Sequence, residues 1–288
     1  MKLHNITTLK SRTPEWLEAR KQLVGASEAA AACGVSKWQS AYTLWAEKTG
    51  RYEREETEAM AMGTLLEDAV LKLYERRIGC DLNRDVGLLV HPAHPFIGAT
   101  PDAIHPDGFP VEAKTTSRRG ADAWGEEGTA DIPLDYLLQV QQQMYVMDQQ
   151  QADVVVWIDT SELRVYHVPR SDKLIGLMVE KIRLFWELVQ SDTPPEIDYQ
   201  HRDASKNIFW KYDKMHDERI NLSGDMASVV RAYDETTQEI KRLTKKKDAL
   251  RAMILDFMGN KTIAENDSHE CRRNVTKRGV TLSVKQKG

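Results

Sequence analysis

The sequence has only three cysteines in 288 residues, Cys33, Cys80 and Cys271, and they lie far apart in the chain. An odd number of distant cysteines without a C-x-x-C pair argues against a disulfide framework and against a cysteine-held zinc or iron–sulfur site. The sequence also lacks a run of eighteen apolar residues, and its first residues lack the apolar core of a signal peptide. We therefore expect a cytoplasmic protein that does not associate with membranes.

Positive and negative charges are distributed unevenly between the C-terminal part of the chain and the rest. Residues 231–288 contain 14 Lys and Arg against 8 Asp and Glu, a net charge of +6. The other 230 residues contain 26 against 36, a net charge of −10, so the formal total of −4 hides an acidic body and a basic tail. Attraction of the body to nucleic acid must then come from local patches.

A short acidic stretch is the most informative part of the body. Residues 111–115 alternate as a strand does, so that Glu112 and Lys114 share one face. Asp102 ends another apolar run ten positions upstream, and His105-Pro106-Asp107-Gly108 between them is a turn signal that joins antiparallel strands. The pattern predicts a hairpin that brings Asp102 beside Glu112.

Two carboxylates and a lysine at this spacing suit metal-dependent phosphodiester hydrolysis. Mg²⁺ or Mn²⁺ takes hard oxygen ligands, and hydrolysis requires such a metal and a polarised water. On spacing alone, a solvated hairpin edge explains the same residues as well. The sequence on both sides of the stretch is needed to choose between these interpretations.

Periodicity predicts an α/β protein with a mixed central sheet flanked by helices. The chain length allows one sizeable domain with an appendage, or two domains. Helices are expected over residues 14–32 with a break at Gly25, 41–48, 59–78, 133–147 and 172–190. Strands are expected over residues 86–90, 96–100, 111–115, 153–158 and 163–168.

The predicted boundaries are a core over residues 1–195, a linker over 196–224 and a basic C-terminal module over 225–288. The module consists of a helix from about 227 to 258 and a β-hairpin formed by two runs, 262–264 and 280–284. One helix cannot cover its own apolar stripe. It must pack on the hairpin, on a partner or on a symmetry mate.

The break at Gly25 resembles an anion cradle. Ser27 is predicted to cap the alanine-rich helix that follows, and Arg20 lies one short segment earlier. Free N–H groups, a hydroxyl and a guanidinium suit phosphate binding. A plain helix–turn–helix with a surface arginine is the alternative.

Two of the predicted helices carry polar residues in informative places. Glu67 lies at the edge of an apolar stripe, and the default for a helical glutamate is solvation. Tyr136, Gln139 and Gln143 share one face, which suits either a solvated helix or hydrogen bonds near a metal. The stripe beside Glu67 consists of Met62, Leu65, Leu66, Ala69, Val70 and Leu73.

Several short motifs occur in one order along the chain. Together they resemble the phage recombination exonucleases of the lambda exonuclease and YqaJ type, within the PD-(D/E)xK nuclease superfamily, over roughly residues 12–190. The motifs are Trp16-Leu17-Glu18-Ala19-Arg20, Gly25-Ala26-Ser27-Glu28, Leu44-Trp45, Lys48-Thr49-Gly50, Gly63-Thr64-Leu65-Leu66-Glu67, Thr100-Pro101-Asp102, Glu112-Ala113-Lys114, Tyr136-Leu137-Leu138-Gln139-Val140-Gln141 and Phe185-Trp186.

The resemblance implies a restriction-endonuclease-like core and a 5′→3′ exonuclease for double-stranded DNA ends. It also implies a ring-shaped homotrimer and dependence on Mg²⁺, with Mn²⁺ as a substitute and two ions per site. By the same resemblance, a metal is held by Asp102, Glu112, the Ala113 carbonyl and Glu67, the attacking water is steadied by Lys114 with Gln139 beside it, and the terminal 5′-phosphate is held by Arg20, Ser27 and Thr100.

Two other functions remain open at this stage. One is a metal-dependent endonuclease of the restriction or repair type. The other is a recombination protein that binds DNA or a partner and has a vestigial nuclease site, although the intact Glu67, Asp102, Glu112 and Lys114 argue against it. The basic tail suits either DNA or a single-strand annealing protein as its partner.

Overall fold

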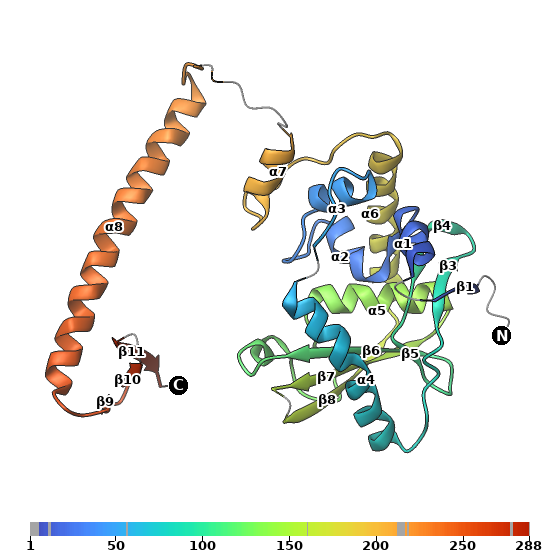
Figure 1. Ribbon diagram of the computed structural model, residues 1–288, viewed down its shortest axis with the longest axis horizontal. Coiled ribbons are helices and arrows are strands. Elements are labelled where there is room, and N and C mark those ends of the chain that lie inside the picture. The colour runs from blue at the N-terminus through green and yellow to red at the C-terminus, as the bar shows by residue number, and fades with distance from the viewer. Residues whose placement is uncertain are drawn as a thin grey trace. The chain divides into compact units, whose positions relative to one another are not determined.

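The computed structural model describes residues 6–10, 13–55, 57–159, 161–211, 217, 219–276 and 279–287. The chain forms two compact units, Met1–Met215 and His216–Gly288 (Figure 1). The division falls inside the predicted linker, of which residues 212–216 and 218 lie outside the described residues. Each unit is treated separately below.

The first unit contains two four-stranded mixed sheets in place of the single central sheet that the sequence predicts. The strand orders are β1-β3-β4-β2 and β5-β6-β7-β8. The strands are β1 (Ile6–Lys10), β2 (Val24–Gly25), β3 (Gly87–His91), β4 (His94–Ala99), β5 (Ala103–Ile104), β6 (Pro110–Thr116), β7 (Gln151–Ile158) and β8 (Glu162–Pro169). The helices are α1 (Pro14–Lys21), α2 (Ala29–Ala32), α3 (Ala41–Lys48), α4 (Glu58–Ile78), α5 (Leu134–Met147), α6 (Asp172–Gln190) and α7 (Ala204–Lys211), with 3-10 turns η1 (Ala26–Glu28) and η2 (Gly120–Ala123).

The chain passes from one sheet to the other at Thr100-Pro101-Asp102. Strand β4 ends at Ala99, and β5 begins at Ala103 and pairs antiparallel with β6 through a turn at residues 105–109. Proline has no N–H to donate to a ladder, so the pairing stops there. The predicted hairpin is confirmed, and its first strand is β5.

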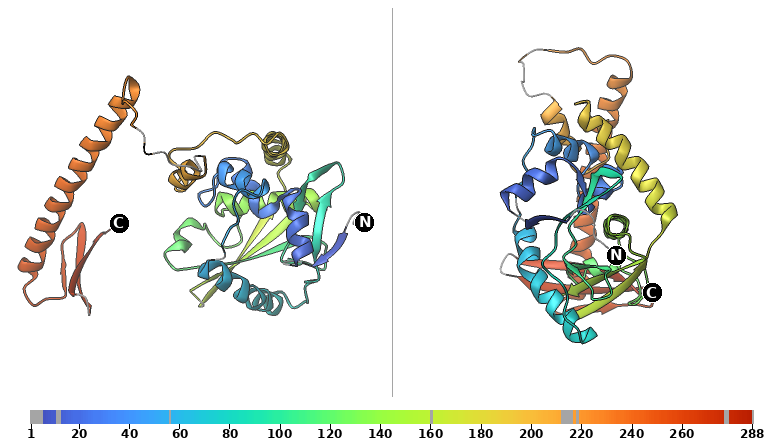
Figure 2. Two further views of the ribbon diagram at one scale, coloured as in Figure 1. Left: turned by 45° about the horizontal axis from the view of Figure 1, so that its top comes forward. Right: turned by 90° about the vertical axis from the view of Figure 1, so that its right-hand side faces the viewer.

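Helices α4 and α5 cover opposite faces of the second sheet (Figure 2). Successive strand side chains point to opposite faces, so Val154 and Val156 pack toward Val140 of α5 while Val155 packs toward Val70 of α4. A separate apolar cluster joins α2, α3 and α6 to Ile97, Val24 and Leu138. Helix α5 therefore lies between a sheet and a layer of helices.

One buried amide of α5 ties the first sheet to this helix. Gln142 donates from Nε2 to the carbonyl oxygens of Val24 on β2 and Gly98 on β4, at 2.8 Å each. The side chain is fully buried. Both contacts are charge-neutral hydrogen bonds, so they fix the position of α5 without burying a charge.

Two local predictions are wrong. Ser27 lies within η1, and Gly25 stands at its N-cap, where its amide donates to Glu28 Oε2 at 2.8 Å. The predicted stripe of α4 is wrong in both halves of the helix. Met62 and Leu65 are exposed, because only the second half packs on the sheet, and in that half the buried face is rotated from the predicted one. The buried residues of α4 are Val70, Leu71 and Tyr74.

Residues 196–211 of the predicted linker pack on the first unit. Asp203 Oδ2 accepts from the Ser40 amide at 3.0 Å and from Thr43 Oγ1 at 2.5 Å. Asn207 is fully buried and donates to Ser40 Oγ at 2.8 Å. Helix α7 is thereby fixed to the start of α3.

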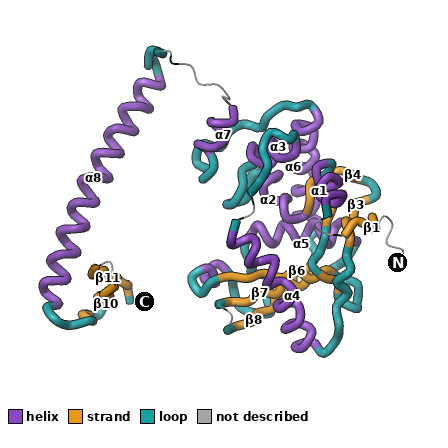
Figure 3. The backbone as a smooth tube through the Cα atoms, viewed as in Figure 1, coloured by secondary structure: helices purple, strands orange, loops and turns teal. Residues whose placement is uncertain are grey.

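The second unit consists of one long helix, α8 (Asp225–Met258), and an antiparallel sheet (Figure 3). The sheet has three strands, β9 (Ile263–Glu265), β10 (His269–Thr276) and β11 (Gly279–Gln286), instead of the predicted two. Strand β10 was missed because residues 269–276 are largely polar and exposed and show no apolar alternation. Among the described residues, none of the helices is apolar and long enough for a membrane span.

Candidate active site

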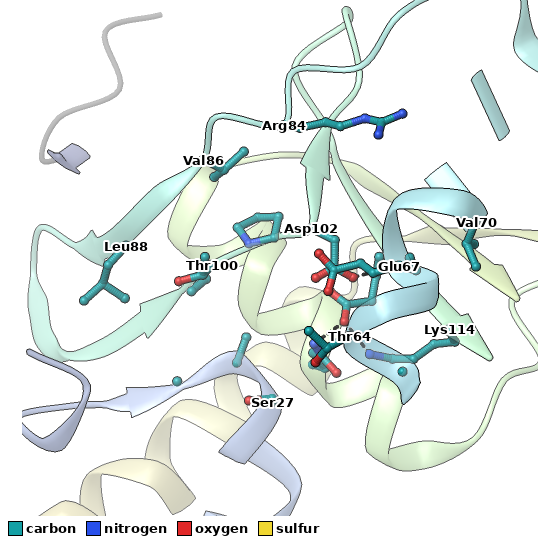
Figure 4. A pocket seen from close by; sticks show the side chains of 18 of the residues that line it. Ser27, Thr64, Glu67, Val70, Arg84, Val86, Leu88, Thr100, Asp102 and Lys114 are labelled. Atoms are coloured by element: carbon teal, nitrogen blue, oxygen red, sulfur yellow. Dashed lines mark hydrogen bonds and ion pairs between the residues drawn. The ribbon is translucent and has the colours of Figure 1, made fainter. Parts of the chain in front are cut away.

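All nine predicted site residues line one cleft of about 480 Å³ in the first unit. The residues come from six separate segments of the chain, from α1 to α5. Figure 4 shows the side chains of Glu67, Asp102 and Lys114 directed toward one another, with Ser27 and Thr100 to one side of them. The cleft thus has an acidic end and an end suited to an anion.

Glu112 is the centre of the acidic end. Its side chain is nearly inaccessible to solvent, and it faces α5 because strand alternation puts Val111 and Ala113 against α4. Glu112 Oε1 accepts from Lys114 and, at 2.5 Å, from Gln139 Nε2, and Oε2 accepts from Gln143 Nε2 at 2.6 Å. Two glutamines of one helix face therefore fix the orientation of this carboxylate.

Lys114 is held in its charged form. Burial alone would lower its pKa, but Glu112 and Asp102 outweigh burial and keep the pKa above the usual lysine value. The ammonium also lies over the ring of Tyr136, 5.1 Å from its centroid. Lys114 is therefore a hydrogen-bond donor and a cation at neutral pH, and it is not a proton acceptor.

Asp102 is fixed by the backbone of the neighbouring strand. Its Oδ2 accepts from the Ala113 amide at 2.8 Å. Because the N–H and C=O of one strand residue point to the same side, the Ala113 carbonyl also faces Asp102. Burial raises the pKa of Asp102 well above the usual value, and the charges of Glu112 and Glu67 raise it further.

The donor set fits a divalent cation. Glu67, Asp102, Glu112 and the Ala113 carbonyl supply the hard oxygens that Mg²⁺ prefers. Burial and the negative charges of Glu112 and Glu67 raise the pKa of Asp102, and a cation would offset those charges. Among the described residues, no three acidic, histidine or cysteine side chains converge closely enough to enclose an ion. Glu112 Oε1 instead accepts hydrogen bonds from Lys114 and Gln139.

Arg20 forms the anion-binding end with Ser27 and Thr100. Its Nη2 donates to Ser27 Oγ at 3.2 Å, and its guanidinium lies over the Trp16 ring at 4.8 Å. Trp16 Nε1 in turn donates to Thr100 Oγ1 at 3.2 Å. A Cβ on Gly25 would lie only 2.8 Å from Arg20 Nη2, so glycine is required for the guanidinium to reach this position.

A buried lysine sets the charge of this end. Glu28 Oε1 lies 2.8 Å from Arg20 Nη2, and Glu28 Oε2 lies 2.7 Å from Lys48 Nζ. Burial would raise the pKa of Glu28, but the charges of Arg20 and Lys48 bring it below the usual value. Burial lowers the pKa of Lys48, and the charge of Glu28 opposes that shift. With Lys48 protonated in its ion pair with Glu28, two cations and one anion give this end a net charge of +1, whereas Arg20 and Glu28 alone would be neutral.

Three charged or amide side chains of this arrangement were not among the predicted site residues: Glu28, Lys48 and Gln143. Each had a signal in the sequence. Glu28 and Lys48 belong to the ordered motifs, and Gln143 shares a helical face with Gln139. Their contacts could not be predicted, because they depend on α3 and α5 meeting segments twenty or more residues away in the sequence.

The chain matches a known family over the part that carries the site. Residues 15–150 match the model of the YqaJ-like viral recombinase domain. The match covers every residue that was predicted for the site and a little under half of the chain. The uncharacterized protein YqaJ of Bacillus subtilis (strain 168) is 33% identical over 177 residues, which is 60% of this chain and 54% of that protein. The chain thus matches about half the length of this relative.

Solved structures share the fold of the YqaJ-like domain. An alkaline exonuclease, LHK-Exo from Laribacter hongkongensis, has a TM-score of 0.54 at 26% identity, covering 62% of this chain and 94% of that one. Its complex with dAMP gives the same score and identity and covers 67% and 99%. The predicted restriction-endonuclease-like fold is confirmed.

Proposed function

We propose that this chain is a phage-type exonuclease that digests linear double-stranded DNA in the 5′→3′ direction with Mg²⁺ as its cofactor. One observation carries the proposal: a single cleft holds an acidic cluster with a charged lysine and, beside it, an arginine–hydroxyl subsite for an anion. The YqaJ-like domain and the alkaline exonuclease structures support the same reaction class.

At the acidic end, two Mg²⁺ ions would be held by Glu67, Asp102, Glu112 and the Ala113 carbonyl. When bound, they polarise the phosphodiester and supply a water of lowered pKa. Lys114 carries a positive charge beside the scissile phosphate and orients the attacking water by donating to it. Gln139 and Gln143 hold Glu112 in place, so the carboxylate does not reorganise during the reaction.

At the other end, Arg20, Ser27 and Thr100 receive the terminal 5′-phosphate. A guanidinium forms charge-assisted hydrogen bonds with phosphate oxygens, and the Trp16 ring and Glu28 already hold it in position. A phosphate subsite has no contact with base edges, so the proposed activity depends on a DNA end and has no sequence preference. A 5′ terminus held beside the acidic cluster gives the 5′→3′ direction.

The test compares three substrates with purified full-length protein in Mg²⁺. Linear duplex with 5′-phosphate ends should be digested rapidly, linear duplex with 5′-hydroxyl ends more slowly, and closed circular duplex not at all. EDTA and the Glu112→Gln variant are the controls for metal dependence and for contaminating nuclease. Cleavage of the closed circle would contradict the proposal and indicate an endonuclease.

The proposed assembly is a homotrimeric ring, and a single-strand annealing protein is the proposed partner. Both follow from the family resemblance alone. Sedimentation of the full-length protein and co-sedimentation with an annealing protein test them independently of cleavage.

A further inference from the structure

Helix α8 exposes large apolar side chains along its whole length. All of its residues are described, and Met258 is the one that is buried. Tyr233 is 75% exposed and Phe257 is 86% exposed. A contiguous apolar surface of this kind marks an interaction site.

The apolar residues follow the repeat of a coiled coil. From Met226 to Phe257 the stripe advances by three and four residues in strict alternation, which is the spacing that turns one seam toward a partner helix. The stripe has two polar positions, Thr236 and Lys247. In full it is Met226, Val229, Tyr233, Thr236, Ile240, Leu243, Lys247, Leu250, Ile254 and Phe257.

The sheet of the second unit covers a different face of the helix. Arg251 Nη2 donates to the Val280 carbonyl, and Arg273 Nη2 donates to the Leu255 carbonyl at 2.5 Å. Leu250 nevertheless remains 49% exposed. Near the sheet the stripe residue Ile254 is half-buried, whereas Leu250 and Phe257 on either side of it stay exposed.

We propose that α8 pairs with α8 of a second copy of this chain in an antiparallel coiled coil, with Ile240 beside Leu243 of the second copy. This inference does not depend on the proposed nuclease activity. Its basis is that the positions of the stripe meet one another in pairs when the second helix runs in the opposite direction. The antiparallel layers are Met226–Phe257, Val229–Ile254, Tyr233–Leu250, Thr236–Lys247 and Ile240–Leu243, each formed twice.

The reversed alignment puts the two polar positions in one layer. Thr236 then lies beside Lys247 of the second copy, and every other layer is apolar on both sides. Parallel alignment would place Lys247 beside Lys247 of the second copy in the seam, which is a like-charge pair in a desolvated position. A single lysine in the seam thus favours the antiparallel arrangement.

Charges beside the seam give the same preference. In the antiparallel pair, Glu239 flanks Lys246 of the second copy, which is an opposite-charge pair that occurs twice. Glu239 already binds Arg242 of its own helix, and a carboxylate has acceptor sites for both partners. In a parallel pair, Lys246 would flank Arg251 of the second copy and repel it.

Cysteine cross-linking of full-length protein tests the orientation. Tyr233→Cys and Leu250→Cys proteins are oxidised separately and as a mixture, and the linked peptides are identified by mass spectrometry, with the unmodified protein as the control for its native cysteines. Antiparallel pairing predicts a 233–250 link that forms only in the mixture. Links of 233 to 233 or 250 to 250 would overturn the proposed orientation.

Charge exchange tests the register by sedimentation at several concentrations. Lys246→Glu or Glu239→Lys should raise the dissociation constant about tenfold, because each turns two attractive pairs into repulsive ones. The double exchange should restore it. The matched control is Lys245→Glu, on the outer face. Tighter association of Lys246→Glu would indicate parallel helices and contradict the proposal.

The stripe itself is tested with Leu243→Asp, with circular dichroism as the control for helix content. The particle mass of the full-length protein should fall to half, because the apolar centre of the pair is lost. An unchanged mass would show that α8 is not the contact between copies, and the inference would be wrong.

Discussion

Helices α5 and α8 place polar and apolar side chains in opposite ways. Helix α5 buries glutamines at four positions, and three of them donate to groups that define the first unit: Glu112 and the carbonyls of β2 and β4. Helix α8 exposes isoleucine, leucine, tyrosine and phenylalanine. The four buried glutamines of α5 are Gln139, Gln141, Gln142 and Gln143.

This difference indicates that the two helices have different roles. Buried polar groups persist where they have partners, and here Gln139 and Gln143 bind Glu112 of the candidate site while Gln141 and Gln142 bind backbone groups. Exposed apolar groups in a regular repeat persist where their partner lies outside the chain. Substitutions in α5 should therefore alter cleavage, and substitutions in α8 should alter assembly.

The largest effect is expected at the residue that the α5 glutamines hold. Glu112→Gln should abolish cleavage of linear duplex, because it removes the charge of a proposed metal ligand while keeping the shape of the side chain. Glu187→Gln, an exposed glutamate paired with Arg183 on α6, is the matched control and should cleave normally. Wild-type rates for Glu112→Gln would refute the site assignment.

The boundary between the two units can be tested by truncation. A chain ending at Lys211 should fold and retain cleavage. A chain ending at Pro195 loses Asp203 and Asn207, which leaves the Ser40 amide without its acceptor, at about 1–3 kcal/mol, and removes two partners of Thr43 Oγ1. Thermal unfolding should show a clearly lower midpoint for the shorter chain. Equal midpoints would place the end of the first unit at residue 195.

A paired substitution compares the two helices directly. Gln143→Leu should lower the cleavage rate by about 10- to 100-fold, as does the loss of a group that positions a metal ligand, with the particle mass unchanged. Leu250→Gln should weaken association of the chains, with the cleavage rate unchanged. If Gln143→Leu changed only the particle mass and Leu250→Gln changed only the cleavage rate, the proposed difference between the two helices would be wrong.

End preference should depend on a lysine that does not line the cleft. Lys48→Met leaves Arg20 paired with Glu28 and removes the net positive charge of the anion-binding end. The preference for 5′-phosphate over 5′-hydroxyl ends should fall about tenfold, which corresponds to the weaker part of the range for a charged hydrogen bond. Lys48→Arg should preserve it. A rate that falls equally on both ends would indicate a merely structural role.

The smallest expected effect concerns stability in EDTA. The pKa of Asp102 is raised, so the folded protein binds this proton more tightly than the unfolded chain does. That stabilisation is complete below the ordinary carboxyl pKa of about 4 and is lost as the pH rises through the raised value. Asp102→Asn avoids the loss, so its melting midpoint should exceed that of the wild type by a margin that grows as the pH rises above about 4, by about 2–4 °C for each kcal/mol. A wild type that is more stable at pH 8 would contradict this.

Periodic segments of the fold were predictable. Helices α3 and α6 have the predicted bounds, because an apolar stripe and capping residues mark both ends. The α4 stripe was wrong, since periodicity does not show how much of a helix the sheet covers. The two-sheet arrangement was also missed. Strand pairing stops at Pro101, but the apolar residues before and after it in the sequence show no sign of the change of sheet.

The sequence was sufficient to predict which residues form the site, but not all of their contacts. Asp102, Glu112 and Lys114 follow from a turn and strand alternation, and the ordered motifs added Arg20, Ser27, Thr100, Glu67 and Gln139. Their roles remain predictions. The Glu28–Lys48 pair and the hold of Gln143 on Glu112 are long-range contacts, which no local pattern contains.

The two ends of the cleft share one support. Gln142 fixes β2, which leads directly into the turn with Ser27, and Gln139 and Gln143 on the same helix fix Glu112. A single helix therefore fixes the distance between the proposed 5′-phosphate subsite and Glu112. In the proposed exonuclease, the length removed at each step is then set by the protein and is the same for every DNA sequence.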